Sequence, residues 1–328
     1  MSDDGKRFES FSDITGEQMD ILPSAYSLKS VHNNAYYELS NEELESLSLK
    51  LDDIEYVELI HVAPHKRLIR LRSLGKYYIL LDASDPTKEY RSYELLQRHG
   101  VRTLPIYAMA KTDLWCAILM EDLHLSDIWK LASPRDVSDY NSGVALGKWY
   151  KDFHEKGVGL INDEDAAFLE REYDELTAKT IHWAAEQLGL SNCGGIQLAA
   201  EYIEAIKRKA RTYPETVLYN DFSHENMALT HDGAEAAMFD YHLIGRGYRY
   251  SDIRNILSGL KGAAIDGFIE GYGKYDESEK MMDDVLAPLY SLLVAAQRKT
   301  LPKWAKPIIK EVKKGLLEEK LRLLLKTF

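Results

Sequence analysis

The chain has 328 residues, of which 45% are hydrophobic and 29% charged, and its formal net charge is −12 at pH 7. This length can bury a large core, either as one long domain or as two lobes, and the composition is that of a globular protein. The negative balance disfavours a general nucleic-acid binder, because neutralising phosphates requires a basic face. No run approaches about 18 uninterrupted apolar residues, so we expect no membrane span.

The first part of the chain predicts a tail, one short helix and then strands. Residues 1–20 are polar and acidic and lack the apolar core of a signal sequence, so we expect a flexible tail and a cytoplasmic protein. Residues 41–51 predict a short helix capped by Ser40 or Asn41. A second helix is expected over 87–98, ended by Gly100. Runs rich in β-branched and aromatic residues predict five strands, over 56–62, 68–72, 77–81, 105–109 and 115–120.

After residue 123 the pattern is mainly helical. Ser133 and Pro134 start a predicted helix that stops at Gly157. Amphipathic patterns then predict helices over 163–188 and 196–212, and residues 252–328 are predicted to be helical. Within that last part, apolar residues at helical spacing between lysines over 306–326 favour a closing helix packed on the larger lobe over a helix lying on a membrane surface. The two cysteines, Cys116 and Cys193, form neither a disulfide framework nor a metal-ligand spacing.

Two apolar, strand-like segments between these helices each carry an acid at or near their ends. Segment 217–229 holds Asp221 and, five positions later, Asn226, and segment 237–241 holds Asp240. A loop Asp-x-x-x-x-Asn followed by a hairpin and an apolar strand ending in Asp is the arrangement that phosphoryl transfer requires. One Asp orients the attacking hydroxyl, while the Asn and the second Asp hold Mg²⁺ on the nucleotide phosphates. No G-x-x-x-x-G-K-[ST] run occurs, so a phosphate-loop NTPase is not expected.

At these residues the chain resembles the aminoglycoside phosphotransferase and choline kinase group, the small-molecule branch of the protein-kinase-like fold. The loop from Leu218 to Asn226 is similar to the family's H-[GN]-D-x-x-x-x-N, with Tyr219 in place of His, and Phe239-Asp240-Tyr241 is similar to its I-D-[FWY] strand end. Weaker similarities, in the family's order, are a hinge segment at 118–123 and a helix at 146–154. The resemblance covers roughly residues 55–275.

This resemblance implies a two-lobed α+β protein-kinase-like fold. A small N-terminal nucleotide-binding lobe over 21–122 would hold a five-stranded antiparallel sheet and one helix, and a larger, mainly helical lobe over 123–328 would hold the catalytic and substrate sites. It also implies roles for individual residues: Asp221 as the catalytic base, Asn226 and Asp240 as the Mg²⁺ ligands, and Met120, Glu121, Leu123 and Glu89 as contacts of ATP or GTP.

The sequence departs from the family pattern at the phosphate contacts. Leu81 stands where the family's third strand carries a Lys or Arg that contacts the α/β-phosphates, and the turn over 62–66, which would cover the phosphates, has no glycine. Glu89 falls where the partner of that cation would lie. Three side chains could supply the cation instead, of which strand alternation favours Lys76 least: Lys66, Arg70 and Lys76.

Three further residues have structural expectations. Asp252 is expected to receive hydrogen bonds that fix the loop after Asp240. His154 is expected to pack beneath the catalytic loop, and Tyr219, which cannot charge as a histidine can, is expected to be structural rather than catalytic.

The sequence therefore predicts Mg²⁺-dependent transfer of the γ-phosphate of ATP or GTP to a hydroxyl group of a small molecule. The net charge of −12 and the tyrosine-rich stretches are compatible with a cationic acceptor, such as an aminoglycoside or an amino alcohol. The alternative is a degenerate relative that binds a ligand or a protein partner without catalysis. Leu81 and the glycine-free turn favour this alternative, and retention of Asp221, Asn226 and Asp240 opposes it. The acceptor, the choice of nucleotide and the oligomeric state are left open.

Overall fold

The computed structural model describes residues 41–50, 53–63, 66–83 and 87–328; the tail expected over 1–20 and the expected cap Ser40 lie outside them. The chain divides into two compact units. The first comprises the described residues up to Lys151 together with Asp221–His242 and Gly259–Tyr272. The second comprises Asp152–Asn220, Leu243–Ser258 and Gly273–Phe328. The lobe boundary expected after residue 122 stays a prediction.

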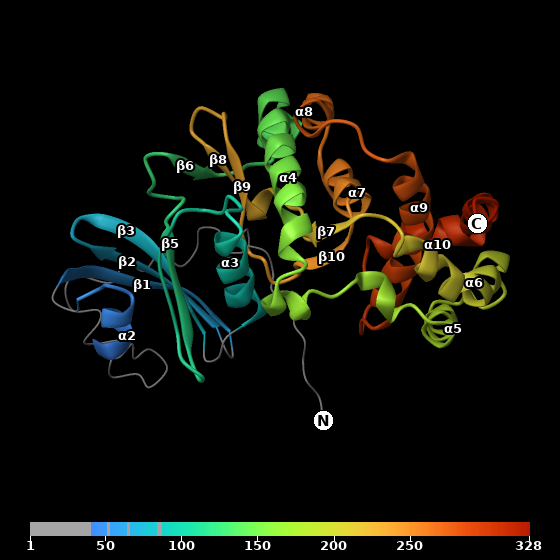
Figure 1. Cartoon of the computed structure of the whole chain (residues 1–328), viewed down its shortest axis with the longest axis horizontal. Coiled ribbons are helices and arrows are strands. Elements are labelled where there is room, and N and C mark those ends of the chain that lie inside the picture. Colours follow the sequence, from blue (N-terminus) through green and yellow to red (C-terminus); the bar gives the residue numbers. More distant parts are fainter. Residues whose placement is uncertain (1–40, 51–52, 64–65, 84–86) are drawn as a thin grey trace. The chain divides into compact units, whose positions relative to one another are not determined.

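The first unit contains a five-stranded antiparallel sheet with the strand order β1-β2-β3-β5-β4 (Figure 1). All five expected strands are present, and so is the predicted antiparallel arrangement, because each expected run is short, rich in residues that favour strands and bounded by turns. The strands are β1 (Ile54–Ala63), β2 (Lys66–Ser73), β3 (Lys76–Ala83), β4 (Ile106–Lys111) and β5 (Cys116–Glu121).

Two helices accompany this sheet. The short helix α2 (Asn41–Ser46) adds Leu44 to a buried cluster that also takes Leu71 and Leu80 from the strands. Helix α3 (Lys88–Arg98) begins after Thr87, whose hydroxyl accepts a hydrogen bond from the Tyr90 amide at 3.2 Å. The Thr87 cap and the periodic apolar face explain why α3 could be predicted, whereas α2 ends at Ser46, before the end expected at residue 51.

The rest of the first unit contains a small three-stranded sheet with the strand order β6-β8-β9. It also contains the first half of α4 and the helix α8. The elements are β6 (Trp129–Leu131), β8 (Met227–Thr230), β9 (Ala236–Met238), α4 (Tyr140–Leu160) and α8 (Ala263–Tyr272).

Helix α4 begins at Tyr140, later than the start predicted at Ser133 and Pro134, and it continues to Leu160, past the stop predicted at Gly157. A Cβ atom on Gly157 would lie 2.3 Å from the Thr216 hydroxyl oxygen and 2.8 Å from the Val217 amide nitrogen. Glycine is therefore present here because another strand approaches the helix closely, and not because the helix ends.

The prediction of one long helix over 163–188 is wrong. The chain forms two 3₁₀ turns, Glu164–Phe168 and Glu172–Glu175, and only then the helix α5 (Ala178–Gln187). Between the turns, the Glu170 carbonyl accepts a hydrogen bond from the Arg246 amide at 3.0 Å, which a helix would have used internally. The sequence has the amphipathic period of a helix, but this long-range backbone hydrogen bond interrupts the helix.

The second unit is mainly helical, with one two-stranded antiparallel sheet. The closing helix expected over 306–326 does pack on other helices, but Gly315, with φ of +86°, divides it in two. None of the helices that the structure describes is both long enough and apolar enough to cross a membrane. The elements are α6 (Gly194–Ala210), β7 (Glu215–Leu218), β10 (Gly245–Tyr248), α7 (Tyr250–Gly259), α9 (Glu277–Ala296), α10 (Ala305–Lys313) and α11 (Leu316–Leu325).

Candidate active site

The hairpin of β8 and β9 brings Asn226 and Asp240 to one end of the same pair of strands. Met227 pairs with Met238, and the Phe239 amide continues the ladder by donating to the Asn226 carbonyl at 3.1 Å. Asp240 then leaves the strand with φ of +61°, a conformation that Asp tolerates better than most residues. The two predicted metal ligands are thus fixed by local strand pairing.

Asp221 joins them through Asn226. The Asn226 side-chain amide donates to the Asp221 carboxylate at 3.0 Å and to the Asp221 carbonyl at 3.2 Å. Asn226 is buried, with 6% of its surface exposed. All the residues proposed from the sequence for catalysis, metal binding and nucleotide binding lie in the first unit.

His242 is a site residue that the sequence reasoning missed. Its Nδ1 lies 2.8 Å from the Asp240 carboxylate. Burial lowers the pKa of His242, but its hydrogen bond to Asp240 and the charges of Asp240, Asp221 and Glu89 raise that pKa above the ordinary value. The Asp-x-His spacing was the signal available in the sequence.

The carboxylate of Asp240 is held in its charged form. Burial raises its pKa, but the hydrogen bond to His242 and the charge of Lys66 bring it below the ordinary value. Helix α3 also contacts this position, since the Asp240 amide donates to the Tyr93 hydroxyl at 3.4 Å. An ionised, oriented carboxylate is what a ligand of a hard cation needs.

Glu89 has a cationic partner, although Leu81 is an apolar residue that is only 2% exposed. The Lys66 ammonium, at the start of β2, forms a hydrogen-bonded ion pair with the buried Glu89 carboxylate. Burial lowers the pKa of Lys66, but the charges of Glu89 and Asp240 raise it above its ordinary value. Lys66 is therefore charged at neutral pH.

The other two candidate cations are engaged elsewhere. The Arg70 guanidinium lies 2.5 Å from the Asp122 carboxylate and 2.8 Å from that of Glu58. The Lys76 ammonium donates to the Tyr107 hydroxyl at 2.6 Å. Neither is paired with Glu89.

The expected hinge residues lie at the end of β5. Met120 is in the strand and buried, and the Glu121 amide donates to the Pro105 carbonyl at 3.0 Å. The Glu121 carboxylate accepts a hydrogen bond from Tyr107. Leu123 lies in the turn that follows. The nucleotide contacts of these residues stay a prediction.

In the second unit, Asp252 fixes the backbone just before Asp221. Its carboxylate accepts the Tyr219 amide at 2.7 Å and the Asn220 amide at 2.8 Å, and His154 Nε2 lies 3.2 Å away. The contacts of Asp252 therefore hold the segment before Asp221, whereas the sequence had assigned it to the loop after Asp240. Its exposed fraction is 1%, and Tyr219 and His154 are fully buried, as their expected structural roles require.

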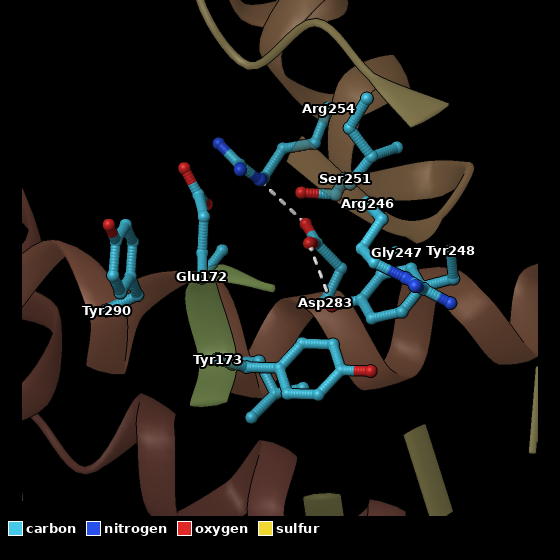
Figure 2. A pocket seen from close by; sticks show the side chains of 12 residues that line it. Glu172, Tyr173, Arg246, Gly247, Tyr248, Ser251, Arg254, Asp283 and Tyr290 are labelled. Atoms are coloured by element: carbon cyan, nitrogen blue, oxygen red, sulfur yellow. Dashed lines mark hydrogen bonds and ion pairs between the residues drawn. The ribbon is translucent and has the colours of Figure 1, made fainter. Parts of the chain in front are cut away.

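A cavity that the sequence did not predict, lined by both charged and apolar side chains, lies within the second unit (Figure 2). Asp283 accepts hydrogen bonds there from Arg254 Nε at 2.7 Å and from the Tyr248 hydroxyl at 3.1 Å. Burial, opposed by Arg254, raises the pKa of Glu172 to about 7 and that of Asp283 to about 6. These acids stand far apart in the sequence, so no spacing signalled them.

The donor set around Asp240 suits magnesium. Among the described residues, no three or more His, Cys, Asp or Glu side chains gather into a group that could hold a metal ion. Mg²⁺ does not need such a cage, because it commonly takes one or two protein ligands and completes its shell with water and phosphate oxygens. The side-chain oxygens of Asn226 and Asp240 are donors of that kind.

The comparisons with known proteins identify the family and the fold. The model of the phosphotransferase enzyme family, APH, matches residues 76–285, and the chain belongs to this family. Family and fold together identify a small-molecule phosphotransferase with a protein-kinase-like fold, which confirms the predicted fold class. A search of curated protein sequences returned no match.

Several solved structures share the fold. A choline/ethanolamine kinase family protein from Mesorhizobium loti is 14% identical, with a TM-score of 0.54 over 90% of this chain and 99% of that chain. An ethanolamine kinase from Plasmodium vivax is 13% identical, with a TM-score of 0.53 over 94% and 99%. A choline kinase from Cryptosporidium parvum is 14% identical, with a TM-score of 0.50 over 85% and 94%. At these identities the likeness is one of fold.

Proposed function

We propose that this phosphotransferase moves the γ-phosphate of ATP or GTP, with Mg²⁺, to a hydroxyl group of a small cationic acceptor such as an amino alcohol or an aminoglycoside. The observation that carries the proposal is the grouping of Asp221, Asn226 and Asp240 at one end of the β8–β9 hairpin, with Asn226 bonded to Asp221. Phosphoryl transfer depends mainly on positioning and on charge, and the strand pairing of this hairpin would supply the positioning.

Asp221 is the proposed base. It would accept a hydrogen bond from the acceptor hydroxyl and take its proton as the new O–P bond forms. The bond between the γ-phosphorus and the β–γ bridging oxygen breaks, and a nucleoside diphosphate leaves. The amide of Asn226, at 3.0 Å, orients the Asp221 carboxylate for this contact.

Asn226 and Asp240 would hold the Mg²⁺. When bound, the ion neutralises charge on the phosphate oxygens. The lowered pKa of Asp240 keeps its carboxylate ionised at the pH of the reaction. The hinge residues Met120, Glu121 and Leu123 would contact the nucleotide, as the family resemblance implies.

The acceptor class is inferred from charge. The chain carries a net charge of −12, and a negative field attracts cations and speeds their encounter with a site. The solved structures of similar fold include proteins named as ethanolamine and choline kinases, whose acceptors are cationic amino alcohols. Choline and ethanolamine are therefore the first acceptors to assay, followed by aminoglycosides.

Calorimetric titration with ATP and with GTP, with and without Mg²⁺, tests the donor side. We expect Mg²⁺-dependent binding that Asp240→Ala weakens. Glu235→Gln is the matched control, because Glu235 is half exposed and only pairs with Arg102 on the surface.

Release of nucleoside diphosphate with choline, ethanolamine and aminoglycosides, and with neutral sugars for comparison, tests the acceptor side. Asp221→Asn should lower kcat by about 10²- to 10⁴-fold while nucleotide affinity is retained, because a general base acts on the chemical step. Absence of nucleotide binding at millimolar concentration would favour the degenerate, non-catalytic alternative.

A further inference from the structure

We propose that Lys66, at the start of β2, is the cation that contacts the nucleotide phosphates, in place of the Lys or Arg that the family resemblance expects on β3. This inference rests on the proposed function, because it assigns a phosphate contact within the same site. It is specific to this chain, in which the expected strand position is apolar.

Strand β3 cannot supply the cation from the expected position. Leu81 is 2% exposed and pairs with Leu68 on one side and Ile118 on the other. The only cationic residue of β3 is Lys76, at its first position. A leucine at this position supplies no charge to the phosphates.

The strand register brings Lys66 to the same side of the sheet as Leu81. Lys66 pairs with Ala83, and Leu68 pairs with Leu81. Directly opposed residues point to the same face, and so do residues two apart on one strand. Lys66 is therefore the diagonal neighbour of Leu81, at roughly 7–8 Å, a gap that long side chains can span.

The charges around Lys66 are those that a phosphate-contacting lysine would have. Its ammonium is paired with Glu89, the acid that the resemblance assigns as the partner of that cation. The charge of Asp240, the candidate metal ligand, also raises the pKa of Lys66. The Lys66 side chain is 23% exposed, and that of Glu89 is 6% exposed.

The remaining cations of β2 and β3 near this position have other partners. Arg67 pairs with Asp82, whose second oxygen accepts from the Trp115 indole at 2.6 Å. Arg70 is bonded to Asp122 and Glu58, and Lys76 to Tyr107. Lys66 is thus the candidate cation that the structure pairs with Glu89.

To test the assignment, the affinities of four proteins for Mg·ADP and Mg·ATP are measured by calorimetry. These are the wild type, Lys66→Met, the relocation variant Lys66→Met/Leu81→Lys, and the control Lys76→Met. We expect Lys66→Met to weaken binding of both nucleotides about 10- to 100-fold, because a charge-assisted contact to phosphate is lost. Affinity for the phosphate-free nucleoside should be unchanged, which a merely structural role of Lys66 would not explain. Relocation should restore part of the loss.

A chemical label gives an independent readout on the unmodified chain. In an acyl-phosphate derivative of ATP, a lysine amine beside the phosphates attacks the acyl carbon, an amide forms and the nucleotide phosphate leaves. Mass spectrometry should place the label on Lys66 in the wild type and at position 81 in the relocation variant. An excess of Mg·ATP should prevent the labelling.

The outcomes separate this inference from the proposed function. If the wild type binds Mg·ATP but Lys66→Met binds it equally well and the label falls elsewhere, the inference is wrong and the proposed function stands. If the wild type binds no nucleotide, both fail. Should Lys66→Met unfold because Glu89 is left buried without a partner, Lys66→Met/Glu89→Gln removes that charge, and the labelling result on the wild type still decides.

Discussion

Replacing Asp252 by alanine should destabilise the second unit strongly and misplace the backbone that precedes Asp221. The buried carboxylate accepts two backbone amides at 2.7 and 2.8 Å and lies 3.2 Å from His154. Each hydrogen bond to a charged group contributes about 1.5–3 kcal/mol, and losing the acceptor leaves buried donors unsatisfied. We therefore expect a loss of about 3–5 kcal/mol in the free energy of unfolding, a magnitude typical of a broken buried charge network. Asp252→Asn, which retains one acceptor oxygen, should lose roughly half as much.

Urea denaturation followed by circular dichroism measures this loss. In a thermal melt, a loss of 1 kcal/mol in the free energy of unfolding lowers the melting temperature of a chain of this size by about 2 °C, so we expect a fall of roughly 6–10 °C. The matched control is Asp152→Ala, which removes an exposed ion pair with Lys156 and should change stability by less than about 0.5 kcal/mol. A loss below about 1 kcal/mol for Asp252→Ala would refute the reasoning, since it would mean that the two amides find other partners.

Two further predictions concern packing and pH. Gly157→Ala should cost about 1–3 kcal/mol, measured by urea denaturation, because its Cβ would overlap Thr216 and Val217; an unchanged midpoint would contradict the close approach. Burial raises the pKa of Glu172 from 4.5 to about 7, so the folded protein retains a proton that the unfolded chain releases, and stability should fall as pH rises through that window. Glu172→Gln should therefore match the wild type near pH 4.5 and exceed it at pH 8 by on the order of 1–3 kcal/mol. A difference that does not vary with pH would argue against this account.

The sequence by itself determined the elements that depend on interactions between residues close together in the chain. The five strands follow from short runs rich in β-branched and aromatic residues between turns. Helix α3 follows from its helical period, the Thr87 cap and the turn at Gly100, and all of these signals act within a few residues. The grouping of Asn226 and Asp240 follows too, because a short hairpin must bring its two ends together. The loop from Asp221 to Asn226 and the strand that ends at Asp240 together indicated the family to which the chain belongs.

Tertiary structure decided the contacts whose partners are distant in the chain. No pattern in the sequence pairs Lys66 with Glu89, because the choice depends on strand register and on which acids already hold the other cations. The helix expected over 163–188 was lost to a backbone hydrogen bond from β10, which local propensity cannot anticipate. Asp252 likewise binds amides more than 30 residues away. Burial makes these long-range bonds obligatory, because the free-energy cost of a buried polar group without a partner exceeds the free energy of a local conformational preference.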